Sequence, residues 1–73
     1  MTLEEGKTGM NLRIVSLEDS PLKTRLMTMG LIPGTKVTVL RSAPFGDPMA
    51  LRIRSYNLAL RREDAGKITV EAV

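Results

Sequence analysis

Residues 10 to 14 alternate between apolar and polar side chains, and this period of two predicts a β-strand over residues 10 to 17. The face expected to point inward consists of Met10, Leu12 and Ile14. The preceding segment, residues 2–8, has Leu3 as its only large apolar side chain. This segment therefore predicts either a short edge segment or a loose end, with the ordered fold beginning near Gly9.

A helix is predicted after this strand, starting at Ser20-Pro21. Serine can cap a free backbone N–H group, and proline suits the first helical position because no hydrogen bond is needed from it there. A helix of about ten residues is too short to be stable alone in water, so packing must hold it. The stripe expected to face the core consists of Leu22, Leu26 and Met29.

The helix is expected to stop at Gly30, which can take the left-handed conformation of a C-terminal cap and place Leu31 against Leu26. Pro33 and Gly34 then fit the two central positions of a type II turn, because proline presets the first φ and glycine accepts the positive second one. Gly30, Pro33 and Gly34 are therefore predicted to have structural roles.

The second half of the chain is predicted to consist mainly of strands. A β-branched, apolar run predicts a strand from about Lys36, and alternation over residues 49–61 predicts a hairpin with its turn at residues 55–57. Residues 62–66 are polar and predict a connection that includes at most one helical turn. The inner face of the last strand is expected to consist of Ile68, Val70 and Ala72.

Five short strands with one short helix after the first predict a mainly β fold. A small closed or nearly closed barrel is the expected arrangement, because closure removes the unpaired edges that an open sheet would leave. The 73 residues predict a single domain, 1–73, with its core at about 9–72. A domain of this size buries only about 60% of the surface of its unfolded chain, so the core will be thin.

The residue types present exclude several classes of function. The chain has no histidine and no cysteine, and it has no glycine-rich phosphate loop, so we expect no catalytic residue, cofactor or metal site. No apolar run reaches the length of a membrane helix, and the first residues lack the pattern of a signal peptide. These absences predict a soluble, unprocessed protein of the cytoplasm. The methionines expected in the core or in a partner contact are Met10, Met27, Met29 and Met49.

One candidate binding segment is the loop Pro44-Phe45-Gly46-Asp47-Pro48. Phe45 lies between two rigid prolines, and two interpretations stay open for it. It is either a lid over the end of the barrel or an exposed aromatic on a preorganised loop, which is a common form of binding hot spot. Asp47 precedes a proline in a turn, so its carboxylate is expected to bond to its own backbone.

A second candidate is a set of arginines. Arg52 and Arg54 are expected to point the same way from one strand, with Arg41 near them on another. This set is either a solvated face or a docking surface for an acidic partner.

The order of these motifs resembles the FeoA family, ferrous iron transport protein A. The matching segments are Gly30-Leu31-Ile32-Pro33-Gly34, then Val37-Thr38-Val39-Leu40-Arg41, then Ala43-Pro44-Phe45-Gly46-Asp47-Pro48, with Leu58-Ala59-Leu60-Arg61, Asp64-Ala65 and Ile68-Thr69-Val70 after them. The resemblance implies an SH3-like barrel. It also implies a cytoplasmic accessory protein of bacterial ferrous iron uptake that acts on FeoB, a membrane transporter with a cytosolic G-protein region. Membrane contact would then be only indirect, through FeoB.

Three alternatives stay open. The first is a nucleic-acid-binding small barrel, since the net charge is +3, although Phe45 and Tyr56 are the only aromatic residues available to stack on bases. A salt-dependent affinity for duplex or RNA would identify it. The second is a standalone SH3-like domain related to iron-dependent repressors. The third, which concerns partners, is weak self-association.

Overall fold

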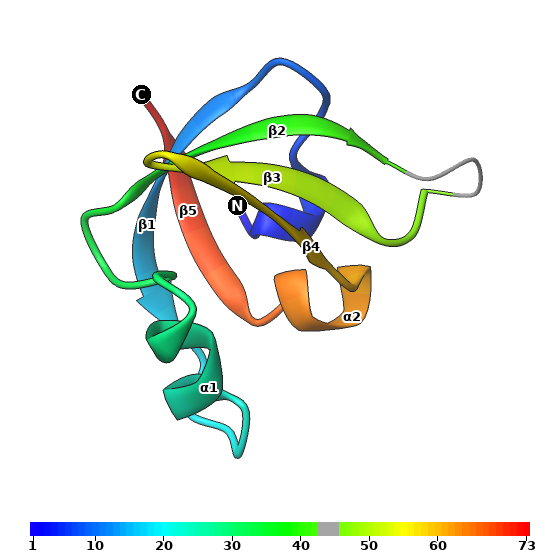
Figure 1. The fold of residues 1–73 in the computed structure, drawn as a ribbon. Helices are drawn as coiled ribbons and strands as arrows, with labels where there is room; N and C mark the ends of the chain where they lie inside the picture. Colours follow the sequence, from blue (N-terminus) through cyan, green and yellow to red (C-terminus); the bar gives the residue numbers. More distant parts are fainter. Residues whose placement is uncertain (43–45) are drawn as a thin grey trace.

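The computed structural model of this chain describes residues 1–42 and 46–73. Within them, five strands form one antiparallel sheet with the order β4-β3-β2-β1-β5 (Figure 1). The strands are β1 (Asn11–Leu17), β2 (Lys36–Ser42), β3 (Met49–Ile53), β4 (Tyr56–Leu60) and β5 (Ile68–Ala72). The helical elements are η1 (Leu3–Glu5), α1 (Lys23–Thr28) and α2 (Arg62–Ala65). The mainly β fold with a short helix after the first strand is confirmed, but β4 and β5 are the two edges of a curved, open sheet.

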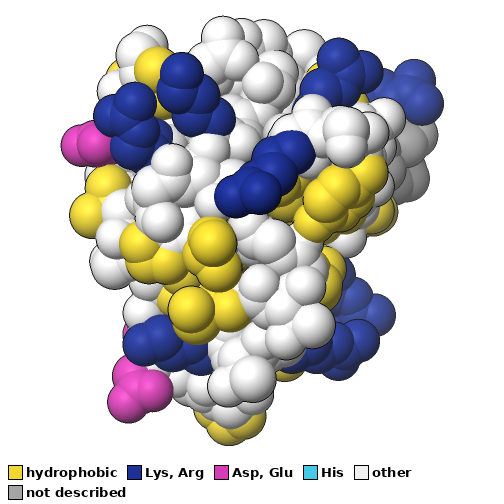
Figure 2. Space-filling view, turned by 60° about the vertical axis from the view of Figure 1, so that its left-hand side comes forward, with side chains coloured by type: hydrophobic (Ala, Val, Ile, Leu, Met, Phe, Trp, Pro, Cys, Tyr) yellow, Lys and Arg dark blue, Asp and Glu magenta, His cyan; other side chains and the backbone are white. Residues whose placement is uncertain are grey.

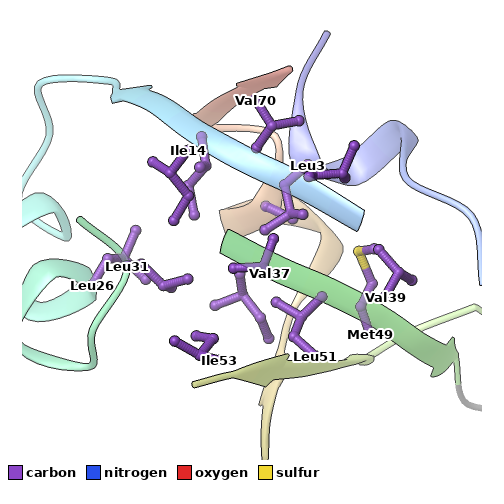
Figure 3. Packing of buried hydrophobic residues seen from close by; sticks show 14 of the residues in the cluster. Leu3, Ile14, Leu26, Leu31, Val37, Val39, Met49, Leu51, Ile53 and Val70 are labelled. Carbon is purple, nitrogen blue, oxygen red and sulfur yellow. The ribbon is translucent and has the colours of Figure 1, made fainter. Parts of the chain in front are cut away.

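The core lies on the concave side of the sheet, where alternate residues of each strand meet. Figure 3 shows Val37, Leu51 and Val70, from three different strands, directed into one interior. The largest fully buried side chains are Leu3, Leu12, Ile14, Leu31, Met49, Leu51, Ile53 and Ile68. Of the four methionines expected to pack, Met49 is buried and Met10 and Met29 lie against the core, whereas Met27 is exposed.

A β-bulge in β1 changes the alternation that the sequence predicts. The register with β5 shifts between Ile14 and Ser16, so one residue is added to β1 without a partner. Val15 and Ser16 are therefore both exposed, and Leu17 turns inward and is buried. At the opposite end of the same pair of strands, Ala72 stands opposite the buried Leu12 and so lies on the inner face as predicted, although it is exposed at the end of the strand.

The stop of α1 is confirmed as a Schellman cap. Gly30 has φ +100°, the N–H of Leu31 donates to the carbonyl of Leu26 at 3.1 Å, and the N–H of Gly30 donates to the carbonyl of Met27 at 3.0 Å. The turn that follows is also confirmed, since Gly34 has φ +93° and Thr35 N–H donates to the carbonyl of Ile32 at 3.1 Å.

The start of α1 is later than predicted. Ser20 is not the cap of this helix, because the N-cap residue is Leu22 and it has no side-chain cap. The Oγ of Ser20 accepts from the N–H of Leu22 at 3.3 Å, and its carbonyl accepts from the N–H of Lys23 at 3.0 Å. The bonds at Ser20 close a turn rather than a helical repeat, and the helix itself spans the 6 residues Lys23–Thr28. It has fewer residues than the ten or so expected.

The N-terminal segment is part of the fold, so the expectation that order begins near Gly9 was wrong. Leu3 is completely buried, and Thr2 forms an isolated bridge with Thr69 of β5. The N–H of Val70 also donates to the carbonyl of Met1 at 2.9 Å. Of the two interpretations of residues 2–8, the short edge segment is the correct one.

The hairpin of β3 and β4 turns one residue earlier than predicted. Arg54 and Ser55 form its two-residue turn, with Ile53 paired to Tyr56. Arg54 has φ +56°, which the sequence did not indicate because arginine seldom occupies that region. The polar connection after β4 contains one helical turn, α2, as expected.

Candidate partner-binding site

Only part of the predicted loop can be described. Pro44 and Phe45 lie outside the described residues, so the two interpretations of Phe45 stay predictions. Gly46, Asp47 and Pro48 are described, and all are at least partly exposed. Their backbone leads directly into β3.

This half of the loop is fastened to α2 by Arg62. The Nε of Arg62 donates to the carbonyl of Gly46, and the backbone N–H of Arg62 donates to Oδ1 of Asp47 at 3.1 Å. Asp47 thus bonds the first residue of α2, 15 residues away, rather than its own backbone as expected. Arg62 also donates from Nη1 to the carbonyl of Glu4 at 2.6 Å. The loop, α2 and η1 are held together by this one arginine, whose role the sequence did not indicate.

The outer face of the sheet is basic. Strands β1 to β4 contain four Lys or Arg residues and no Asp or Glu, and the basic residues are Arg13, Lys36, Arg41 and Arg52. Arg13 pairs with Glu71 of β5 at 3.6 Å, and both side chains are largely exposed. Figure 2 turns the side of the molecule that carries β1 and α1 toward the viewer, and there Lys and Arg side chains far outnumber acidic ones, with hydrophobic patches between them.

Two of the predicted arginines share this face. Arg52 stands opposite Thr38 on one side and Asn57 on the other, and its Nε donates to Oδ1 of Asn57 at 3.3 Å. Arg41 of β2 stands opposite Ala50 of β3. Since Ala50 is two residues from Arg52 on β3, Arg41 and Arg52 are diagonal neighbours. Arg54 does not belong to this row, because it lies in the turn beyond the end of β3.

The predicted residues therefore form two separate areas. Arg52 and Arg54 line a shallow hollow of about 400 Å³ at the tip of the β3–β4 hairpin. Pro48 precedes the other end of β3, and the six residue-to-residue steps of extended chain from Pro48 to Arg54 correspond to roughly 20 Å. The loop and the hairpin tip cannot contact one small ligand together, and only a macromolecular partner could cover both.

A larger groove, of about 490 Å³, was not predicted as a site. One wall is a face of α1 with its two caps, formed by Leu22, Arg25, Leu26 and Met29. The other wall is the end of β4, formed by Ala59, Leu60 and Arg61, and Glu63 and Asp64 of α2 complete the lining. The sequence predicted that the apolar stripe of this helix would lie in the core. In fact only Leu26 is buried, while Leu22 and Met29 are partly exposed to the groove.

Tyr56 links β4 to the end of α1. Its hydroxyl donates to the backbone carbonyl of Met29 at the end of α1, 27 residues away in the chain. A Cβ added to Gly30 would lie 2.5 Å from the same hydroxyl. Glycine at position 30 is thus required twice, by its positive φ and by the close approach of Tyr56.

Charged groups outside the groove give little indication of chemistry. In residues 1–42 and 46–73, no three acidic, histidine or cysteine side chains lie close enough together to hold a metal ion. The pKa of Glu5 is lowered from 4.5, mainly because the backbone N–H of Thr2 donates to its carboxylate at 2.7 Å. Among the described residues, no helix is long and apolar enough to cross a membrane.

The sheet and its short helices together define the class, a small SH3-like domain. A family model described as the FeoA domain matches residues 1–72. The chain belongs to the FeoA family, and the resemblance found in the sequence is confirmed. The family acts in ferrous iron transport.

The chain is similar to one curated relative and to solved structures of this family. It is 43% identical over 74 residues to an Fe(2+) transport protein A/Fe(2+) transporter FeoB fusion protein of Porphyromonas gingivalis, covering 100% of this chain but only 9% of that protein. A FeoA-like protein from Clostridium acetobutylicum has a TM-score of 0.94 at 34% identity, with 100% of this chain and 86% of that chain covered. A zinc complex of FeoA from Stenotrophomonas maltophilia, described as an SH3 domain protein, has a TM-score of 0.85 at 24% identity, with 97% and 89% covered. The last comparison supports the fold alone.

Proposed function

We propose that this domain is a non-catalytic, cytoplasmic accessory component of ferrous iron uptake that binds FeoB at its cytosolic G-protein region and regulates the transporter. The observation that carries this proposal is the Porphyromonas gingivalis relative, in which a FeoA region and FeoB are parts of one chain. Two proteins that work as one chain in one organism are expected to meet as separate chains in another, because fusion only raises their effective concentration.

The charge distribution supports docking to an acidic surface. The outer face of β1 to β4 has no carboxylate, so an acidic partner would meet no repulsion there. Exposed charges of this kind mainly accelerate association and lose their effect as salt rises. The loop from Pro44 to Pro48, with Phe45 at its centre, stays the predicted second contact.

Calorimetry and surface plasmon resonance with the purified cytosolic region of FeoB test the proposal. We expect saturable binding, a changed rate of GTP hydrolysis in that region, and an association rate that falls steeply with salt. Arg52→Glu combined with Arg54→Glu should slow association about tenfold. Lys7→Glu is the matched control, because Lys7 is exposed and lies outside the strands.

Phe45→Ala tests the predicted loop contact separately. A weakening of about 2 kcal/mol with an unchanged circular dichroism spectrum would identify Phe45 as a hot spot. Unfolding of this variant would instead identify Phe45 as a lid on the core. If wild-type protein does not bind the cytosolic region of FeoB at all, the proposed function is wrong.

A further inference from the structure

The β4 strand presents backbone hydrogen-bonding groups that no other element uses. It pairs with β3 alone, and Ile53 and Tyr56 flank the two-residue turn between them. In an antiparallel ladder the residues flanking such a turn exchange both hydrogen bonds, and every second pair thereafter does the same. Leu58 and Leu60 thus bond to β3, whereas Asn57 and Ala59 direct their N–H and C=O groups toward the free edge.

Nothing in the described part of the chain covers this edge. No backbone hydrogen bond outside the ladders involves Asn57 or Ala59, and the bonds to the carbonyl of Arg61 belong to the start of α2. Edge strands of this kind usually are covered, bulged or charged, because open donors and acceptors attract other strands. β4 has none of these protections, since its ladder is regular and its residues are Tyr, Asn, Leu, Ala and Leu.

The groove beside α1 adjoins the C-terminal end of the same edge. Ala59, Leu60 and Arg61 are consecutive residues of its wall, and α1 stands opposite them. The partly exposed Leu22 and Met29 provide apolar surface in its lining. An extended chain laid on β4 would therefore place alternate side chains into a groove that already exists and whose lining combines apolar residues of α1 with charged side chains.

We propose that β4 accepts an extended segment of the cytosolic region of FeoB as an additional strand, a step that rests on the proposed function. Main-chain bonds to Asn57 and Ala59 supply affinity, and the groove selects a segment with apolar residues at alternating positions. Arg25 and Arg61 on the rim attract an acidic residue of this segment, while Glu63 and Asp64 attract a basic one. The segment is thus of mixed charge, unlike the acidic surface that suits the outer face of the sheet.

A second copy of this chain fits the edge less well. Two antiparallel β4 strands that match Asn57 with Ala59 would set Arg61 of one copy opposite Ser55 of the other. Arg61 would then lie next to Arg54, in the same turn as Ser55. Like charges that face each other across strands are destabilising, so the pairing of two copies is disfavoured.

Residue-resolved amide hydrogen exchange, measured by NMR on the free domain and on its complex with the cytosolic region of FeoB, tests this proposal. We expect the amides of Asn57 and Ala59 to exchange rapidly in the free domain and at least tenfold more slowly in the complex. A complex whose Asn57 and Ala59 amides exchange as fast as in the free domain overturns this inference alone. Absence of any complex overturns the proposed function and this inference with it. Protection that grows with the concentration of the free domain would identify a second copy as the occupant and overturn the inference.

Ala59→Pro gives an independent test by mutation. The N–H of Ala59 is not used in pairing with β3, so proline removes a donor to the partner while the hairpin can remain. Ala59→Ser is the matched control, because serine keeps the N–H. We expect Ala59→Pro to weaken binding at least tenfold and Ala59→Ser less than twofold, in variants whose thermal midpoints show that they are folded. Equal binding by the two folded variants contradicts the proposal, and if Ala59→Pro does not fold, the exchange of the wild-type amides decides.

Discussion

The two edge strands of this sheet, β5 and β4, differ in whether another segment of the chain covers them. The β5 edge is covered by the N-terminal segment, where Val70 N–H donates to the carbonyl of Met1 and Thr2 bridges Thr69. The β4 edge, in the described residues, has no such cover and lies beside a groove. Both are edges of one small sheet, so the difference is not a requirement of the fold.

In this chain of 73 residues, the covered β5 edge contributes to stability, whereas the open β4 edge is the one that we infer to recognise a partner. Cover on the β5 side adds Leu3 to a thin core, whereas the β4 side leaves Leu22 and Met29 partly exposed. A protein of this size has little apolar surface to spare, so an uncompleted edge beside exposed apolar side chains points to a partner that completes it.

The strongest test of the covered edge is Leu3→Ala. Leu3 is fully buried, so its truncation should cost about 2 to 5 kcal/mol, whereas Leu22→Ala on the groove side should cost roughly 1 kcal/mol or less. Thermal unfolding followed by circular dichroism measures both. Equal losses would mean that the two sides contribute alike to stability, and the comparison would not hold.

A smaller effect is expected where α1 meets β4. Gly30→Ala and Gly34→Ala share the strain of a positive φ, roughly 1 to 2 kcal/mol each, but only the first meets the hydroxyl of Tyr56. Gly30→Ala should therefore lose about 1 kcal/mol more, because Tyr56 must move and give up its bond to Met29. In a Tyr56→Phe background the excess should vanish, and urea unfolding of the double-mutant cycle measures it. If Gly30→Ala still loses more stability than Gly34→Ala in the Tyr56→Phe background, the proposed link between β4 and α1 through the Tyr56 hydroxyl is contradicted.

Asp47→Ala should indirectly weaken the attachment of the N-terminal segment to the β5 edge. Asp47 accepts from the first N–H of α2, and removal of such a cap costs about 1 kcal/mol. Because Arg62 of α2 also holds Glu4, the amide of Val70 should exchange faster in this variant. Asp47→Asn keeps an acceptor oxygen and is the control. If Val70 exchange is the same in both variants, α2 does not support the N-terminal segment.

The smallest expected effect is on the pH dependence of the stability of η1. Since the N–H of Thr2 lowers the pKa of Glu5 below 4.5, the ionised carboxylate stabilises η1 fully above pH 4.5, and this contribution is lost as pH falls through the lowered value. Thr2 amide shifts in an NMR titration should follow this loss. Glu5→Gln should show no such titration, and an identical curve in that variant would assign the effect to another group.

The sequence predicted local structure correctly where that structure depends on residues that are adjacent in the chain. The cap at Gly30 and the turn at Pro33-Gly34 depend on backbone preferences of a few neighbouring residues, and both were correct. The N-terminal segment was only partly predicted, since the burial of Leu3 depends on pairing with Thr69, far away in the chain. The bulge after Ile14 likewise reflects the register with β5, which no single strand reveals.

The candidate site could be predicted only in part. Sequence patterns indicated basic residues on a strand, and Arg41 and Arg52 do share a face, but the turn placed Arg54 elsewhere. The groove was missed because a stripe at helical spacing indicates a buried face without showing how much of it is covered. A six-residue helix that buries Leu26 alone leaves the rest of that stripe at the surface.

Amide exchange of the free domain at the two edges tests the central claim most directly. Val70 and Ala59 are both edge-strand residues, and the account predicts strong protection for the Val70 amide, which bonds the Met1 carbonyl, and rapid exchange for the Ala59 amide. Leu58 and Leu60, paired to β3, serve as internal references for β4. Protection of Ala59 equal to that of Leu58 and Leu60 in the free, monomeric domain would show that the β4 edge is already occupied and would contradict the account.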